Sequence, residues 1–171
     1  MSYLTLHVNS KNKEKVHPMK ISKISVMAAL LLSLVQVNAF AEISVEGEKA
    51  KQVVVDYFSA LNKSDVKKIV SLYHKNSVFL PNNAPASRGI EEIEKTYQAV
   101  LNTIKLNTTH IYHHVSVSGG IAVVESKANG NLTVLETKEI SPANDNELFV
   151  LKKVNGNWKI DRYMFNSSEH H

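Results

Sequence analysis

The stretch Asn146–Asn166, NELFVLKKVNGNWKIDRYMFN, decides the fold of this chain. Two runs rich in apolar residues flank Asn155-Gly156, the dipeptide that most readily takes the positive φ angles of a two-residue hairpin turn. The stretch therefore predicts two antiparallel strands, Glu147–Val154 and Trp158–Asn166. We interpret them as the closing hairpin of a curved antiparallel sheet.

Alternation of apolar and polar residues predicts the rest of the sheet upstream of this hairpin. The connections between these strands are short and contain Gly119-Gly120 and Asn129-Gly130, which are typical of hairpins. The strand candidates are Ser77–Leu80, which Pro81 ends, Thr108–Ser118, Ile121–Lys127 and Leu132–Ile140.

Helices are predicted before most of these strands, because apolar residues recur there three and four positions apart. They are expected over Val45–Asn62, over a short segment after Ser64 or Asp65 that includes Tyr73 on its inner face, and over Ile90–Ile104. Three helices followed by a run of antiparallel strands indicate an α+β fold with the helices on one face of the sheet.

The first 41 residues have the features of a leader. Lys20 and Lys23 precede the apolar run Ile24–Val35, and Ala39-Phe40-Ala41 offers a small-x-small cleavage site. We interpret residues 19–41 as a secretory signal peptide and residues 1–18 as a segment that a start at Met19 would omit. A membrane anchor is the alternative, but twelve apolar residues are too few to cross a hydrocarbon core of about 30 Å. We expect a folded domain over residues 42–171, periplasmic or secreted, without membrane anchoring after cleavage.

The net charge of the chain belongs to this leader. Residues 1–41 carry five lysines and one glutamate, which account for the whole formal charge of +4. The remainder has equal numbers of basic and acidic residues and no nucleic-acid-binding motif, so we expect no nucleic-acid partner. The chain contains no cysteine, which excludes disulfides and thiolate chemistry.

Three stretches carry a resemblance to a known family: Tyr57–Asn62 with Asp65, Ser87–Ile90, and Asn146–Asn166. With the order of elements, they resemble the nuclear transport factor 2-like superfamily and its SnoaL-like, ketosteroid-isomerase-like branch, which includes small proteins of the SgcJ/EcaC type. The resemblance covers residues 42–171. It implies a cone in which three helices and a strongly curved, mostly antiparallel sheet enclose an apolar pocket, and it implies a homodimer.

The resemblance also implies which residues steroid isomerisation on this fold would need. A carboxylate base moves the proton, while a tyrosine and a protonated carboxylic acid stabilise the oxyanion. Tyr57 matches the tyrosine, and Glu147 is the nearest match to the acid. Pro81 stands where the base is expected, so we do not expect steroid isomerisation by this route.

Three other residues are candidates to replace the missing base: His110, His114 and Asp161. By alternation, His110, Tyr112 and His114 share one strand face, and Asp161 shares a face with Tyr163, with pairing to a lysine or arginine as its alternative. Two histidines four residues apart on a strand lie about 13 Å apart, so we expect no metal site. The sequence contains no glycine-rich phosphate loop, so we expect no cofactor. The expected ligand-binding residues are Tyr57, Phe79, Tyr97, Tyr112, Tyr163 and Phe165.

Three functions remain open from the sequence. The first is a binding module for a small apolar or carbonyl-bearing molecule, in which Tyr57 and Tyr97 orient the ligand or else remain core tyrosines. The second is a lyase, isomerase or cyclase that acts on a small carbonyl compound. The third is a dimeric protein-interaction module whose pocket is plugged by Phe79, Tyr97 and Phe165 and whose outer sheet face binds a partner.

Overall fold

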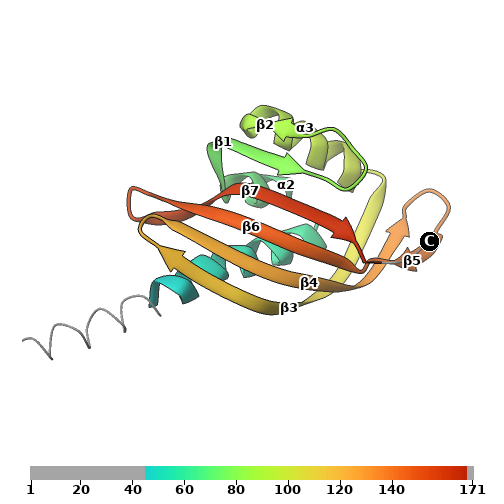
Figure 1. Ribbon diagram of the computed structural model, residues 1–171. Helices are drawn as coiled ribbons and strands as arrows, with labels where there is room; N and C mark the ends of the chain where they lie inside the picture. The colour runs from blue at the N-terminus through green and yellow to red at the C-terminus, as the bar shows by residue number, and fades with distance from the viewer. Residues whose placement is uncertain (1–44, 169–171) are drawn as a thin grey trace, which may run out of the picture. The chain divides into compact units, whose positions relative to one another are not determined.

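Three helices lie against one face of a seven-stranded sheet in the computed structural model, which describes residues 45–168 (Figure 1). The strand order is β2-β1-β7-β6-β4-β3, and β5 pairs with β4. The strand pairs are antiparallel except for β1 with β7, which run parallel. The predicted α+β class with a mostly antiparallel sheet is confirmed. The predicted signal peptide lies outside the described residues.

The described chain begins in a helix over residues 45–62 and ends in the predicted closing hairpin. Asp65 caps the second helix by accepting a hydrogen bond from the amide of Lys68 at 2.9 Å. No helix in the described range is long and apolar enough to cross a membrane. The further elements are α2 Val66–Ser71, β1 Tyr73–Leu80, β2 Ser87–Arg88, α3 Gly89–Leu101, β3 Ile104–Ser118, β4 Ile121–Val134, β5 Ile140–Pro142, β6 Asp145–Val154 and β7 Asn157–Ser167.

The predicted hairpin turn at Asn129-Gly130 is wrong. β4 runs straight through this dipeptide, and the chain turns later, over residues 135–139, before β5. Gly130 pairs with Thr108, and a side chain at Gly130 would collide with the backbone of Asn107 and Thr108. Glycine is therefore required here for the close approach of β3 and β4, and not for a turn.

Two predicted helix ends are also wrong. The third helix ends at Leu101 and not at Ile104, because Ile104 already pairs with Val134 as the first residue of β3. Tyr73 belongs to β1 and not to the short helix before it. Strand pairing thus overrides the helical spacing of apolar residues at both positions.

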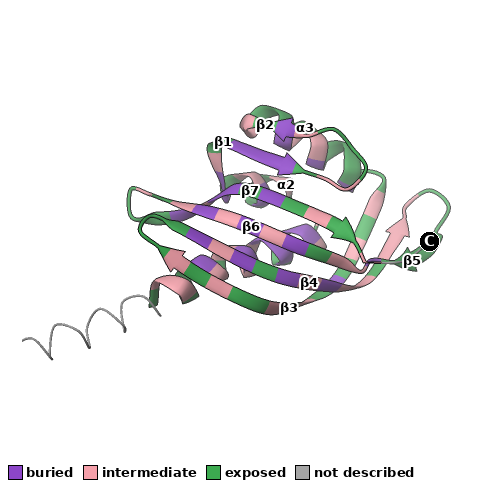
Figure 2. Cartoon of the chain, in the orientation of Figure 1, coloured by how far each residue is buried: buried purple, intermediate pink, exposed green. Residues whose placement is uncertain are grey.

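The core lies between the helix of residues 45–62 and the face of the sheet that this helix covers, here called the inner face. Buried and less buried residues alternate along β4 and β6, as predicted for strands with one covered face (Figure 2). Val54 and Tyr57 of the helix and Phe149 of β6 are almost completely buried. The predicted apolar stripe of the first helix therefore faces the sheet.

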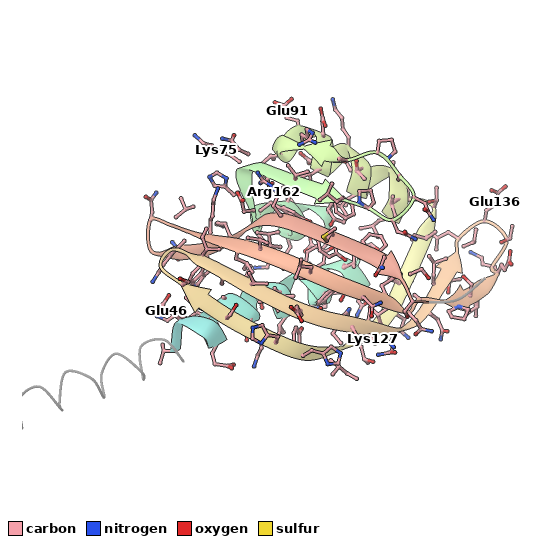
Figure 3. All side chains as sticks on the ribbon, viewed as in Figure 1. Glu46, Lys75, Glu91, Lys127, Glu136 and Arg162 are labelled. Atoms are coloured by element: carbon pink, nitrogen blue, oxygen red, sulfur yellow. The ribbon has the colours of Figure 1, made fainter. Side chains whose placement is uncertain are left out.

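Glu46 lies at the beginning of the first helix (Figure 3). Its contacts tie this helix to the closing hairpin. Its carboxylate accepts a hydrogen bond from the Trp158 indole at 2.9 Å and pairs with Lys153 at 2.6 Å and Lys49 at 2.9 Å. Hydrogen bonds from Lys153 and Lys49 lower the pKa of Glu46 to about 2. The carboxylate is therefore ionised at any pH near neutrality.

Glu46→Gln is expected to lower the melting temperature and to shift Trp158 emission, because glutamine keeps an acceptor for the indole but loses the attraction of both lysines. Trp158 is the only tryptophan of the chain, so its fluorescence reports this contact directly. Glu48→Gln is the control, since Glu48 pairs with Lys51 at the exposed surface of the same helix. Equal changes in both variants would contradict the proposed role of Glu46.

Candidate functional site

A cavity of about 290 Å³ opens between the helices and the inner face of the sheet. Most of its lining is apolar, and its polar residues are concentrated on the strands. The lining residues are Tyr57, Leu61, Phe79, Pro81, Ala84, Thr96, Tyr97, Val100, Ile104, Leu106, Thr108, His110, Ala128, Leu132, Pro142, Ala143, Asn144, Asp145, Glu147, Tyr163, Phe165 and Ser167. An apolar cavity with a few polar groups is the usual form of a small-molecule site.

Five of the six aromatic residues predicted to bind a ligand line this cavity: Tyr57, Phe79, Tyr97, Tyr163 and Phe165. Phe79 stacks between Tyr97 and Tyr163, with ring centroids 5.2 Å and 5.3 Å away. The rings therefore form part of the cavity wall and do not fill the cavity, so the predicted alternative of a plugged pocket is wrong.

Tyr57 and Tyr97 belong to a chain of three buried hydroxyl groups. The hydroxyl of Tyr97 lies 2.7 Å from that of Tyr57 and 2.8 Å from that of Tyr73. The three hydroxyl groups carry three protons, and the two hydrogen bonds between them use two of these protons. One hydroxyl proton is therefore not used by these two bonds. Burial raises the pKa of all three hydroxyls well above the usual range, which keeps them protonated. Tyr57 is thus a core tyrosine with a satisfied hydroxyl, and it also lines the cavity.

Glu147 is the carboxyl group most deeply built into the cavity wall, with 7% of its surface exposed. It accepts hydrogen bonds from the Ser126 hydroxyl at 2.9 Å and the Tyr163 hydroxyl at 3.1 Å. Burial, with a smaller contribution from the charge of Asp145, raises the pKa of Glu147 to about 7, against the lowering effect of the two hydrogen bonds. The group therefore changes charge near neutral pH.

The predicted site residues do not include Glu147, although the resemblance matches it to the hydrogen-bonding acid. The signal that could have found it is the alternation of Glu147, Phe149 and Leu151, which places this carboxylate on the buried face of β6. A charged residue at an apolar position of a predicted strand needs a partner or a function.

His110 is the one predicted replacement base that lines the cavity. Its ring stacks on Phe58 with centroids 3.4 Å apart, and Nε2 lies 3.4 Å from the hydroxyl of Thr108. Burial lowers the pKa of His110 to about 4. The imidazole is therefore neutral at pH 7 and carries a lone pair that can accept a proton.

The predicted shared strand face does not extend to His114, and neither His114 nor Tyr112 lines the cavity. The register of β3 against β4 shifts between them, since Tyr112 pairs with Ser126 and His114 with Glu125, which leaves His113 as an extra residue. This bulge interrupts the alternation, and both His113 and His114 are exposed. Tyr112 stays half-buried against the core but is not among the residues that line the cavity.

The prediction that Asp161 faces the pocket is also wrong, and its alternative, pairing with basic side chains, is confirmed. The register of β6 against β7 shifts so that Val150 pairs with Arg162 and Leu151 with Ile160, which leaves Asp161 in a bulge. The carboxylate of Asp161 lies 3.0 Å from Arg162, 3.3 Å from Lys152 and 3.7 Å from His74. It is not among the cavity-lining residues. Among the described residues, no group of three or more potential ligands is arranged to hold a metal ion.

Glu147→Gln is expected to change how stability depends on pH. The pKa of about 7 in the folded protein lies above the ordinary value of 4.5 for glutamate, so the natural protein loses stability relative to the variant as pH rises from 4.5 to 7. The loss is about 3 kcal/mol in total. Urea unfolding of both proteins at pH 5 and pH 8 measures it.

The lowered pKa of His110 acts in the opposite direction, since it makes stability rise with pH between about 4 and 6.5. His110 is present in both proteins, so its contribution cancels in the difference between them. Parallel stability curves for the two proteins would show that Glu147 titrates normally.

Comparison with known proteins agrees with this geometry. Residues 54–151 match the SnoaL-like domain family. No curated protein matches the sequence. A ketosteroid isomerase-like protein from Erwinia carotovora atroseptica is similar in structure, with 26% sequence identity and a TM-score of 0.70, over 73% of this chain and 98% of that chain.

Two more distant structures share the fold alone. A protein of the NTF2-like (nuclear transport factor 2-like) family from Streptomyces avermitilis is 16% identical with a TM-score of 0.65, over 72% of this chain and 97% of that one. A domain with a cystatin-like fold from Nostoc punctiforme is 14% identical with a TM-score of 0.60, over 73% of this chain and 79% of that one. The chain therefore belongs to the SnoaL-like domain family and has the NTF2-like, ketosteroid isomerase-like fold.

Proposed function

We propose that this chain is an exported SnoaL-like domain that binds a small, largely apolar molecule in its cavity. The observation that carries the proposal is the cavity itself, about 290 Å³ between the helices and the sheet. Side chains such as Leu61, Leu106 and Leu132 would surround the body of a ligand. Export is supported by the leader pattern of residues 19–41, and a homodimer by the family resemblance.

Polar side chains on one side of the cavity would orient the ligand. Thr108 and His110 on β3, Asp145 and Glu147 on β6, and Ser167 on β7 line it together, and we call these five residues the polar wall. Pro81 lines the cavity at the position where the family resemblance places a catalytic carboxylate. This favours binding over isomerisation by the route that needs that base.

The full chain, purified after expression in a bacterial host, is expected to retain a small molecule in native mass spectrometry and to release it under denaturing conditions. Ala128→Leu should abolish this retention, because Ala128 lines the cavity and a larger side chain would take the space of the ligand. Its unfolding free energy should not fall by the 1–3 kcal/mol that is usual for an overpacked core, because the added atoms enter an open space.

Thr109→Leu is the matched control, because it adds a leucine at an exposed position of the neighbouring strand. This variant should retain the molecule as the natural protein does. Retention by Ala128→Leu, or an empty natural protein that binds no small apolar probe, would contradict the proposal.

A second candidate function is a lyase, isomerase or cyclase that acts on a small carbonyl compound. The observation that favours it is the neutral imidazole of His110 in the cavity, since a neutral imidazole can remove a proton next to a carbonyl group. His110 is then the group that stands in for the missing carboxylate base.

If this second function holds, the protein accelerates exchange of the α-protons of cyclohexanone in D₂O at pH 7, and His110→Gln reduces the acceleration about a hundredfold, as loss of a general base does. Proton NMR measures the exchange rate. His113→Gln is the control, since His113 is exposed in the bulge of β3. Equal exchange with and without the protein would leave the binding module as the better-supported function.

A further inference from the structure

The polar wall combines residues of three strands across β4. His110 pairs with Ala128, Ala128 with Asp145, and Asp145 with Ser167, so that these four residues form one row across the sheet. Neighbouring strands lie about 4.8 Å apart, which places the backbones of His110 and Asp145 about 10 Å apart with only the methyl group of Ala128 between them. Glu147 lies two residues along β6 on the same face. The row therefore leaves room for a ligand group beside two carboxyl groups.

The formal charges of this wall have one sign. Asp145 and Glu147 are acidic, and no lysine or arginine is among the described residues that line the cavity. His110 adds no positive charge at neutral pH, because its ring is buried against Phe58 and its pKa is lowered. Lys127, next to Ala128 on β4, is not among the lining residues, since neighbouring strand residues point to opposite faces (Figure 3).

Glu147 is held in place for a partner that donates hydrogen bonds. Ser126 donates to Oε2 and Tyr163 to Oε1, so the carboxyl group is fixed by one bond on each oxygen. A carboxylate has about four acceptor positions, and these two bonds use only two of them. An ammonium group offers up to three N–H donors and a positive charge. The polar wall itself supplies no such cationic donor to Glu147.

The aromatic part of the lining suits the same partner. Phe79, Tyr163 and Phe165 line the cavity, and Tyr163 carries the hydroxyl that donates to Glu147. The three rings stack on one another, with centroids 5.3 Å apart for Phe79 and Tyr163, 5.8 Å for Tyr163 and Phe165, and 6.1 Å for Phe79 and Phe165. Aromatic faces attract cations and also surround an apolar body, so they can contact both ends of an arylalkyl amine.

We infer that the cavity selects an organic amine in its protonated form, with the ammonium group at Glu147 beside Asp145 and the apolar body against the opposite lining. This inference rests on the proposed binding function and names the chemical class of the ligand. An anionic ligand of the same shape is repelled by the Glu147 carboxylate, and a neutral ligand can donate a hydrogen bond to that carboxylate but carries no opposite charge to be attracted by it.

The test is isothermal titration calorimetry of the full chain at pH 8 with three probes that share one body: 2-phenylethylamine, 2-phenylethanol and phenylacetate. The amine is expected to bind at least about tenfold more tightly than the alcohol, the factor that a difference of 1.4 kcal/mol produces. Phenylacetate is expected to bind most weakly. Equal affinity for amine and alcohol, or a preference for phenylacetate, would overturn the amine inference while leaving the proposed binding function intact.

Glu147→Gln should lower the affinity for the amine to that for the alcohol, and leave the alcohol affinity within about twofold, because glutamine keeps the shape but not the charge. Glu125→Gln is the control, since Glu125 is exposed on β4 and is not among the cavity-lining residues. A preference for the amine that survives Glu147→Gln would overturn the inference. If Glu147→Gln fails to fold, the three probes on the natural protein still decide it. Failure of all three probes to bind would instead refute the binding function itself, and the amine inference with it.

Discussion

The packing of one tyrosine ring joins the helices to the sheet. Tyr57 lies edge-on to Phe58 of its own helix, Tyr73 of β1, Tyr97 of α3, Phe149 of β6 and Tyr163 of β7, at centroid distances of 5.1–6.3 Å. Each such aromatic contact contributes about 0.5–1.5 kcal/mol beyond the burial of its surface. Because one ring contacts every layer, it determines how far the first helix stands from the inner face, and therefore where the cavity begins.

The buried carboxyl group of Glu147 lies beside these packed aromatic rings, although its burial lowers the stability of the fold. Burial of a carboxyl group with two neutral donors disfavours its charged form, as the raised pKa of Glu147 records. Asp161 in the same sheet is also buried, but its carboxylate is paired with the basic side chains of Arg162, Lys152 and His74. A carboxyl group without basic neighbours at a cavity is a common sign of a functional site, whereas one paired with basic side chains usually has a structural role.

Two bulges explain why sequence reasoning found some site residues and missed others. Alternation along β3 put His110, Tyr112 and His114 on one strand face, but the extra residue His113 ends that regularity before His114. The extra residue Asp161 had the same effect on β7. Nothing in the residues around either bulge marks it, because a bulge depends on how two strands pair and not on the composition of one.

The sequence by itself determined the helices, most strands, the two glycine-containing turns of the long hairpins and the family, because these depend on local spacing and on residues that favour positive φ. Apolar periodicity also indicated that Tyr57 and Tyr97 lie on the covered sides of their helices, where both are buried. Only the tertiary structure decided which polar groups meet. The polar wall needs β3, β4, β6 and β7 in one register, and a shift of one residue turns a side chain to the other face of the sheet.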